Sequence, residues 1–233
     1  MTDSQFKNFL ANDLNIIDID PILSMFYKYE EILISMNEQF NLTRILKHEE
    51  VLEKHFVDSL FCLKYVDLNG KKIVDLGSGA GFPGLALAII EKNSSFTLIE
   101  SSKKKCMFLN KVIQELGLHN VKVLNTRIEE IDTKEAYDYA LARALTRLNE
   151  LLELAIPLLK VNGHLIAYKN YDNEEEINNS KRALKILKCS ITDNYKYSLP
   201  SFMDLRSLIF IKKMQKTPYK YPRIYSLIKN NSL

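Results

Sequence analysis

The first third of the chain carries apolar residues at helical spacing. Phe26, Tyr29 and Leu33 recur at intervals of three and four residues, which predicts a helix that Pro21 can open. A second run with the same spacing extends from about His48 to Leu63. We therefore expect an all-helical segment over residues 1–66.

From Lys72 onward, short runs rich in β-branched and aromatic residues alternate with helical stretches. The expected strands are Lys72–Leu76, Phe96–Glu100, Val121–Asn125, Tyr137–Ala142, His164–Tyr168, Thr192–Tyr197 and Leu208–Lys212. The expected helices between them are Pro83–Glu91, Lys103–Leu116, Leu148–Val161 and Glu174–Leu187. Gly117 and Gly163 fit the ends of helices, and Gly70 fits a turn.

Strands separated by helices indicate a mostly parallel sheet that is covered on both faces. The last two strands have only a loop around Pro200 between them, so we expect an antiparallel hairpin at the sheet edge. We therefore expect an α/β fold. The chain would consist of an N-terminal helical extension over residues 1–66 and a seven-stranded, Rossmann-like domain over residues 67–233.

The glycines are concentrated at one place. The chain has seven, and four of them lie between Gly77 and Gly84, directly after a predicted strand and before a predicted helix. Glycines let the backbone turn sharply and approach a ligand closely. Asp75 ends the strand, where we expect it to face the ligand crevice, and Glu100 ends the next strand, where a carboxylate can bind ribose hydroxyls.

The loop by itself allows more than one interpretation. Its sequence also satisfies G-x-G-x-x-G, and Glu100 stands near the spacing that a dinucleotide site needs. It lacks the Lys-Ser/Thr pair of a phosphate-binding P-loop. A tight turn without a ligand needs fewer glycines. The acid-x-Gly-x-Gly run from Asp75 and the preceding helical segment favour S-adenosylmethionine (SAM) over a dinucleotide.

Composition limits the classes of protein that fit. The net charge of +3 is mild for a nucleic-acid binder. The three cysteines are widely spaced, so neither a zinc site nor disulfides are expected. No signal peptide or membrane span is apparent, so we expect a cytoplasmic protein. From Leu205 onward there is no acidic residue, and lysines and arginines alternate with tyrosines. Such a tail either binds RNA, with cations on the phosphates and tyrosines stacked on the bases, or is a solvated segment packed along the sheet edge.

Five segments together resemble the bacterial 16S ribosomal RNA guanine-N7 methyltransferase family, also called glucose-inhibited division protein B. They are Asn41–Arg44 with Lys54–Leu60, Asp75–Gly84, Arg127–Glu130, Ala142–Ala144 and Lys216–Arg223. The first and last of these are the specific ones. The chain departs from the family at Asn170, where a glycine is common, and in the tail beyond Arg223.

The resemblance implies SAM as cofactor, with 16S rRNA or the small ribosomal subunit as partner. The implied cofactor contacts, together with the loop residues above, are Asp75, Gly77, Gly79, Phe82, Glu100, Ser101, Ser102, Ile128, Glu129 and Arg143. The RNA contacts that we expect are Arg147, Lys169, Lys216, Lys220 and Arg223.

Guanine N7 carries a lone pair and no proton, so methyl transfer to it requires no general base. We assign no catalytic acid or base and expect positioning to supply most of the rate. Arg143, at the end of the fourth strand, either orients the reactants or forms a surface salt bridge. His55 either contacts RNA or is structural. Asn41 and Thr43 either contact substrate or cap the next helix.

Two other functions stay open on the sequence alone. One is an NAD(P)-dependent oxidoreductase, for which no acid–base residue is evident. The other is a non-catalytic RNA-binding protein on a methyltransferase scaffold. The target nucleotide rests on the resemblance, and the sequence leaves open whether naked rRNA or an assembled subunit is the substrate. We expect a monomer without a bound metal.

Overall fold

The computed structural model describes all 233 residues and contains one seven-stranded sheet with the order β3-β2-β1-β4-β5-β7-β6. All neighbouring strands are parallel except the pairs β5–β7 and β7–β6, which confirms the mostly parallel sheet and its terminal hairpin. The strands are β1 Lys72–Leu76, β2 Ser95–Ile99, β3 Val121–Leu124, β4 Tyr137–Arg143, β5 Leu159–Asn170, β6 Cys189–Ser198 and β7 Leu205–Lys213.

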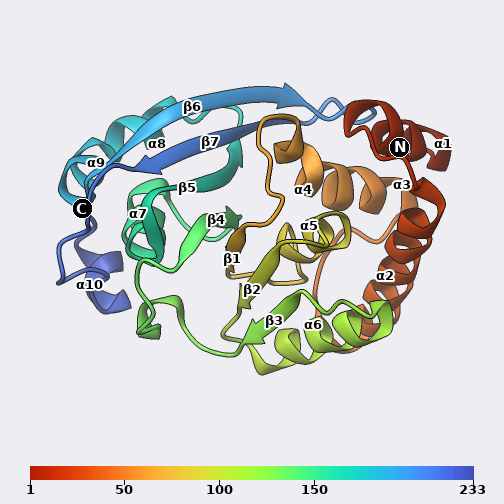
Figure 1. Cartoon of the computed structure of the whole chain (residues 1–233), viewed down its shortest axis with the longest axis horizontal. Helices are drawn as coiled ribbons and strands as arrows, with labels where there is room; N and C mark the ends of the chain where they lie inside the picture. The colour runs from red at the N-terminus through yellow and green to blue at the C-terminus, as the bar shows by residue number, and fades with distance from the viewer.

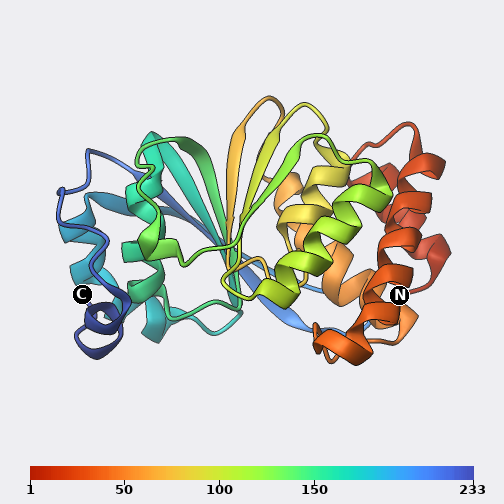
Figure 2. The ribbon, with the colours of Figure 1, turned by 90° about the horizontal axis from the view of Figure 1, so that it is seen from below.

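Helices cover both faces of the sheet (Figures 1 and 2). One face carries α5 Gly84–Ile90, α6 Lys103–Leu116 and the N-terminal helices, which are α1 Asp3–Asn8, α2 Ile19–Phe40, α3 His48–Glu50 and α4 Asp58–Leu60. The other face carries α7 Leu148–Ala155, α8 Glu174–Asn179, α9 Lys181–Leu187 and α10 Tyr225–Asn230. None of these helices is long and apolar enough to cross a bilayer.

Alternation along the strands builds a separate core on each face. In β7, Leu208 and Phe210 join the cluster under the N-terminal helices, whereas Ile209 and Ile211 join the cluster under α7 and α9. Successive side chains of a strand point to opposite faces, so a strand covered on both sides must be apolar at nearly every position. This is why the strands appear in the sequence as short continuous apolar runs.

The N-terminal helices share the first of these cores. The rings of Phe6, Phe26 and Phe56 pack against one another, with centroids 4.8–6.1 Å apart, in the same apolar cluster as residues of β1 and α5. The helix α2 ends at Asn41, which adopts a left-handed conformation with φ of 50°. The division of the chain at residue 66 into a helical extension and a second domain stays a prediction, because the N-terminal helices share their core with β1 and α5.

The second N-terminal run is helical from His48 to Lys64, but its hydrogen-bonding changes along the way. Residues Val51–Val57 form a π-helical segment between α3 and α4, and Phe61–Lys64 form a 3₁₀ turn. Segments of π-helix leave carbonyl groups outside the regular ladder and are frequent at functional sites. Neither Asn41 nor Thr43 caps this run, because its N-cap is Lys47.

The helix expected over Leu148–Val161 was too long. It ends at Ala155 and continues as a short 3₁₀ turn, because Pro157 lacks the N–H that a helix interior needs. The strand β5 then begins at Leu159, so Gly163 lies in a strand and not at a helix end. A Cβ on Gly163 would come within 2.9 Å of the Asp138 carbonyl oxygen, which explains the glycine.

Of two other expected helices, one has the predicted bounds and the other is divided in two. The helix α6 has the predicted bounds, since Ser102 caps its start and Gly117 ends it with φ of 62°. The helix expected over 174–187 is instead divided at Ser180 into α8 and α9. The Ser180 hydroxyl donates to the Glu176 carbonyl oxygen at 2.8 Å, a local bond that competes with regular helix geometry.

Candidate active site

The carboxyl ends of β1, β2, β3 and β4 surround a cavity of about 370 Å³. Ligands of open α/β sheets bind at this edge, and the volume suits a small cofactor. Five of the sequence-predicted cofactor residues line it: Gly77, Glu100, Ser101, Ile128 and Glu129. These residues come from three separate loops, and the fold brings them together.

The glycine loop borders this cavity at Gly77. Gly77, Gly79 and Gly81 all have positive φ, at 66°, 58° and 87°, so each adopts a conformation that a side chain disfavours. Asp75 does not face the crevice, contrary to the expectation from the sequence. Its side chain is buried, and its Oδ2 accepts a hydrogen bond from the Gly84 backbone N–H at 3.1 Å, so that it holds the loop together from beneath.

Glu100 connects the loop to the next helix. Its Oε2 accepts from the Gly79 N–H at 3.0 Å, and its Oε1 accepts from the Ser102 N–H at 2.8 Å. Neither Gly79 nor Ser102 lines the cavity. Their contribution is to fix the carboxylate that does.

Phe82 lies outside the cavity, although the resemblance implied a cofactor contact there. Its ring is buried between His55, stacked at a centroid distance of 4.3 Å, and Tyr29, stacked at 5.3 Å. The guanidinium of Arg143 lies 5.1 Å from the ring centroid. Phe82 therefore joins the glycine loop to the N-terminal helices.

A second cavity, of about 650 Å³, adjoins the first at the ends of β4 and β5. The two cavities share Ala144, Leu145 and Thr146. The second cavity is basic, with five cationic side chains against two carboxylates. The cations are Lys54, Arg143, Arg147, Lys169 and Arg206, and the carboxylates are Asp58 and Glu176.

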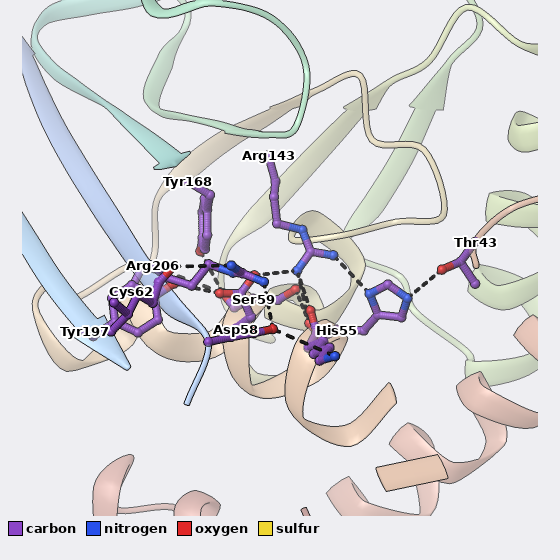
Figure 3. Close-up of polar contacts among 12 residues, drawn as sticks. Thr43, His55, Asp58, Ser59, Cys62, Arg143, Tyr168, Tyr197 and Arg206 are labelled. Atoms are coloured by element: carbon purple, nitrogen blue, oxygen red, sulfur yellow. Dashed lines mark hydrogen bonds and ion pairs between the residues drawn. The ribbon is translucent and has the colours of Figure 1, made fainter. Parts of the chain in front are cut away.

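Arg143 lines this second cavity and is held there by several polar contacts (Figure 3). Its Nη1 donates to Asp58 Oδ2 at 2.9 Å and to the Lys54 carbonyl oxygen at 3.2 Å. Asp58 is buried, and its other oxygen accepts from the Tyr197 hydroxyl at 2.7 Å. Arg143 thus forms no surface salt bridge and does not line the first cavity. It forms a partly buried ion pair with Asp58 on the wall of the second cavity.

His55 has both ring nitrogens occupied. Nδ1 lies 3.4 Å from Nη2 of Arg143, which can only donate, so Nδ1 is the acceptor and Nε2 carries the proton toward Thr43 Oγ1 at 2.9 Å. Burial, and then the charge of Arg143, lowers the pKa of His55 to about 3. The imidazole is neutral, buried and stacked, which supports the structural interpretation of His55.

This burial predicts a pH dependence of stability. The unfolded chain binds a proton at His55 below about pH 6.5, whereas the folded protein does so only near pH 3. The free energy of unfolding therefore falls as the pH is lowered through this window, by about 1.4 kcal/mol per pH unit. Asp75 opposes this fall in the free energy of unfolding. Burial raises the pKa of Asp75 to about 6, so below that pH the folded state holds a proton that the unfolded chain has released.

Urea unfolding at pH 7 and pH 5 separates the two groups. In His55→Gln the histidine contribution is absent, so the variant should lose about 2 kcal/mol less than the wild type between these pH values. The matched control is His119→Gln at an exposed histidine, which should behave as the wild type. Equal losses in the wild type and His55→Gln would show that His55 is not buried in its neutral form.

The expected RNA contacts are not all in one place. Lys169 lines the second cavity, where its Nζ donates to the Thr146 carbonyl oxygen at 2.7 Å and pairs with Glu176 at 2.5 Å. Arg147 lines the same cavity, is exposed and pairs with no carboxylate. Lys216 and Lys220 are exposed beyond the end of β7.

Lys216 lies near the amino end of β4, whereas the two cavities lie at the carboxyl ends of the strands. It lines a small cavity with Lys134 and Glu135, which precede the amino end of β4. Arg223 is not free on the surface either, because it forms a bidentate ion pair with Glu153 at 2.7 and 2.6 Å. The basic tail is therefore not one continuous patch beside the active site.

Known proteins of similar sequence identify the family. A family profile described as rRNA small subunit methyltransferase G matches residues 22–200. Proteins named Ribosomal RNA small subunit methyltransferase G are 45% identical in Fusobacterium nucleatum, over 84% of this chain and 85% of that protein, and 39% identical in Carboxydothermus hydrogenoformans, over 95% of each. The chain belongs to the rRNA small subunit methyltransferase G family.

Solved structures agree on the fold. A SAM-dependent methyltransferase from Aquifex aeolicus aligns with a TM-score of 0.56 at 15% identity, over 72% of this chain and 94% of that chain. A SAM-dependent O-methyltransferase from Thermotoga maritima aligns with a TM-score of 0.54 at 18% identity, over 80% and 72%. Membership of the rRNA small subunit methyltransferase G family makes the chain a SAM-dependent rRNA methyltransferase and not an oxidoreductase.

Several residues of this family member's site are not found by reasoning from the sequence. In the sequence, Asp58 is only one residue of a motif and Arg206 only one cation of the basic tail, and neither Tyr168 nor Tyr197 carries a signal. Asp58, Tyr168 and Arg206 line the second cavity, and the Tyr197 hydroxyl donates to Asp58 (Figure 3). No local pattern marks them, because their partners lie far away along the chain. Tyr225 is in the sequence only one tyrosine of the basic tail, yet it lines the first cavity.

Proposed function

We propose that this protein transfers the methyl group of SAM to N7 of a guanine in 16S rRNA of the small ribosomal subunit. The observation that carries the proposal is the pair of adjoining cavities, which meet at Ala144–Thr146. One suits the cofactor, and the other is basic and open to a nucleotide. A methyl group held at the junction would lie within reach of a base in the second cavity.

The first cavity fits SAM by the chemistry of its lining. The glycine loop offers bare backbone at Gly77, and Glu100 offers a fixed carboxylate for the ribose hydroxyls. Ile128 contributes apolar surface and Glu129 a polar edge for the adenine. Bound there, SAM supplies an electrophilic methyl group on a sulfonium sulfur.

The side chains around the second cavity would act by positioning. The attacking atom is a nitrogen with a free lone pair, and no proton leaves during the transfer. Accordingly, His55 is neutral with both nitrogens engaged, and no free base lines the junction. Alignment of donor and acceptor can lower the barrier by roughly 7–11 kcal/mol. Arg143, fixed by Asp58, would hold the guanine or its phosphate in place.

RNA binding by the basic side chains belongs to the same proposal. Arg147 and Lys169 lie at the cavity that would receive the guanine. Lys216 and Lys220 lie at the opposite edge of the sheet, so they would contact a more distant part of a folded rRNA or assembled subunit. We propose that the enzyme meets this substrate in the cytoplasm and acts there as a monomer.

Methyl transfer from isotopically labelled SAM tests the function. Small subunits that lack N7-methylguanosine are incubated with the enzyme, the rRNA is digested to nucleosides, and the products are separated by mass spectrometry. We expect labelled 7-methylguanosine. The matched control is a small subunit reconstituted with 16S rRNA that contains 7-deazaguanosine, which lacks the acceptor atom and should remain unlabelled. Label on another nucleoside, or bound SAM without transfer to any RNA, would contradict the proposal.

A further inference from the structure

The cofactor cavity has one lining residue from the C-terminal tail. Tyr225 opens α10, is half-buried and lines the cavity with Ile128 and Leu154. The other lining residues come from the end of β2, from the loops that follow β1 to β4, and from α6 and α7. The tail therefore reaches the cofactor site, although it follows the last strand of the sheet.

The tail is fixed at this place by a buried ion pair. Glu153 of α7 is fully buried, and its carboxylate receives Nε of Arg223 at 2.7 Å, Nη2 at 2.6 Å and the Arg223 backbone N–H at 3.0 Å. A buried carboxylate is costly unless it is paired in this way. The pair therefore fixes the chain two residues before Tyr225.

Apolar contacts fix the other side of the segment. Tyr221 and Ile228 are buried, and both belong to the apolar cluster that contains Ile128 and Leu154. Figures 1 and 2 show α10 beside α7 at the C-terminal end of the molecule. Tyr225 thus lies between two anchored residues, which restricts where its ring can go.

We propose that Tyr225 is a cofactor-binding residue whose ring packs against the adenine of SAM, and that Arg223 is the residue that positions it. The inference rests on the proposed function, because it concerns the same cofactor. It changes the role of Arg223, whose charge is neutralised by Glu153 and is directed at the protein, not at RNA.

The lining of the cavity decides which end of SAM meets the ring. Gly77 is the lining residue of the glycine loop, and Glu100 is the carboxylate suited to the ribose. Adenine is the flat apolar end of SAM and fits the apolar lining that the second cavity does not share, which Ile99, Ile128, Leu154 and Tyr225 provide. Aromatic rings bind flat partners well because stacking adds to the area that is buried.

Calorimetric titration with SAM and with adenosine tests the contact. Tyr225→Ala should raise the Kd for SAM about tenfold and the Kd for adenosine by the same factor. Tyr225→Phe retains the ring and should bind within about twofold of the wild type. The matched control is Tyr219→Ala, which removes a tyrosine of the same tail that is 92% exposed and lies outside the cavity.

A purely structural role for Tyr225 would not produce this pattern. Unchanged SAM affinity in Tyr225→Ala would overturn the inference, and so would a loss confined to SAM with normal adenosine binding. A wild-type protein that binds no SAM would instead refute the proposed function. The two failures are therefore distinguishable within the same set of titrations.

The positioning role of Arg223 needs variants that fold. Arg223→Leu alone leaves Glu153 buried and unpaired, so the double variant with Glu153→Leu is the informative one, because it removes both charges. It should weaken SAM binding as much as Tyr225→Ala, and adding Tyr225→Ala to it should weaken binding little further. Full SAM affinity in a folded double variant would show that Arg223 does not position Tyr225.

Discussion

Gly77→Val is expected to weaken SAM binding by on the order of 100-fold or more, which corresponds to about 2.7 kcal/mol. Gly77 lines the cofactor cavity and has φ of 66°. A Cβ there would lie 2.5 Å from Cδ1 of Leu145. Leu145 can move aside, but the added methyl groups then occupy the space above the loop, at the junction of the two cavities. Calorimetric titration with SAM measures the effect.

The matched control is Gly70→Val. Gly70 has nearly the same conformation, with φ of 69°, but a Cβ at this position would meet nothing within 4 Å, and the residue lies in the turn before β1. Both variants bear the backbone strain of a left-handed valine, about 1–2 kcal/mol, so both should unfold at a lower temperature. Only Gly77→Val should lose SAM. An equal loss of affinity in both would mean that strain, not occupation of the site, is the cause.

Arg143→Met is expected to lower methyl transfer by about 100-fold or more and the free energy of unfolding by about 3–5 kcal/mol. The variant leaves the Asp58 carboxylate buried with only Tyr197 as a side-chain partner. Urea unfolding measures the stability, and initial rates with labelled SAM measure the transfer. A variant of normal stability would show that the Asp58 carboxylate is solvated or relaxed without its arginine.

Two comparisons separate stability from activity. Lys160→Met removes an ion pair with Asp138 whose side chains are 43% and 28% exposed, and it should cost no more than about 1 kcal/mol. Combining Arg143→Met with Asp58→Leu removes the unpaired charge and should recover most of the stability. If that double variant also recovers full activity, Arg143 has no positioning role.

Local sequence signals predicted the framework well, because they depend on near neighbours. All seven strands were located, and α6 was predicted with its bounds, since a serine cap, an apolar periodicity and a terminal glycine all lie within one short segment. Errors occurred where a single residue overrode periodicity, as Pro157 did when it ended the helix after β4. The glycine loop was also a local signal, since three of its glycines have the positive φ that their clustering indicated.

The succession of strands and helices along the chain, the position of the glycine loop and the carboxylate at Glu100 could all be predicted from the sequence. Which side chains face the cavities became clear only from the packing of the folded chain. Asp75 and Phe82 turn inward, Arg223 pairs with Glu153 seventy residues away, and Tyr225 reaches the cofactor cavity. Backbone conformation follows from residues within one or two turns, whereas the partner of a charge or ring depends on packing between distant segments, which no local pattern encodes.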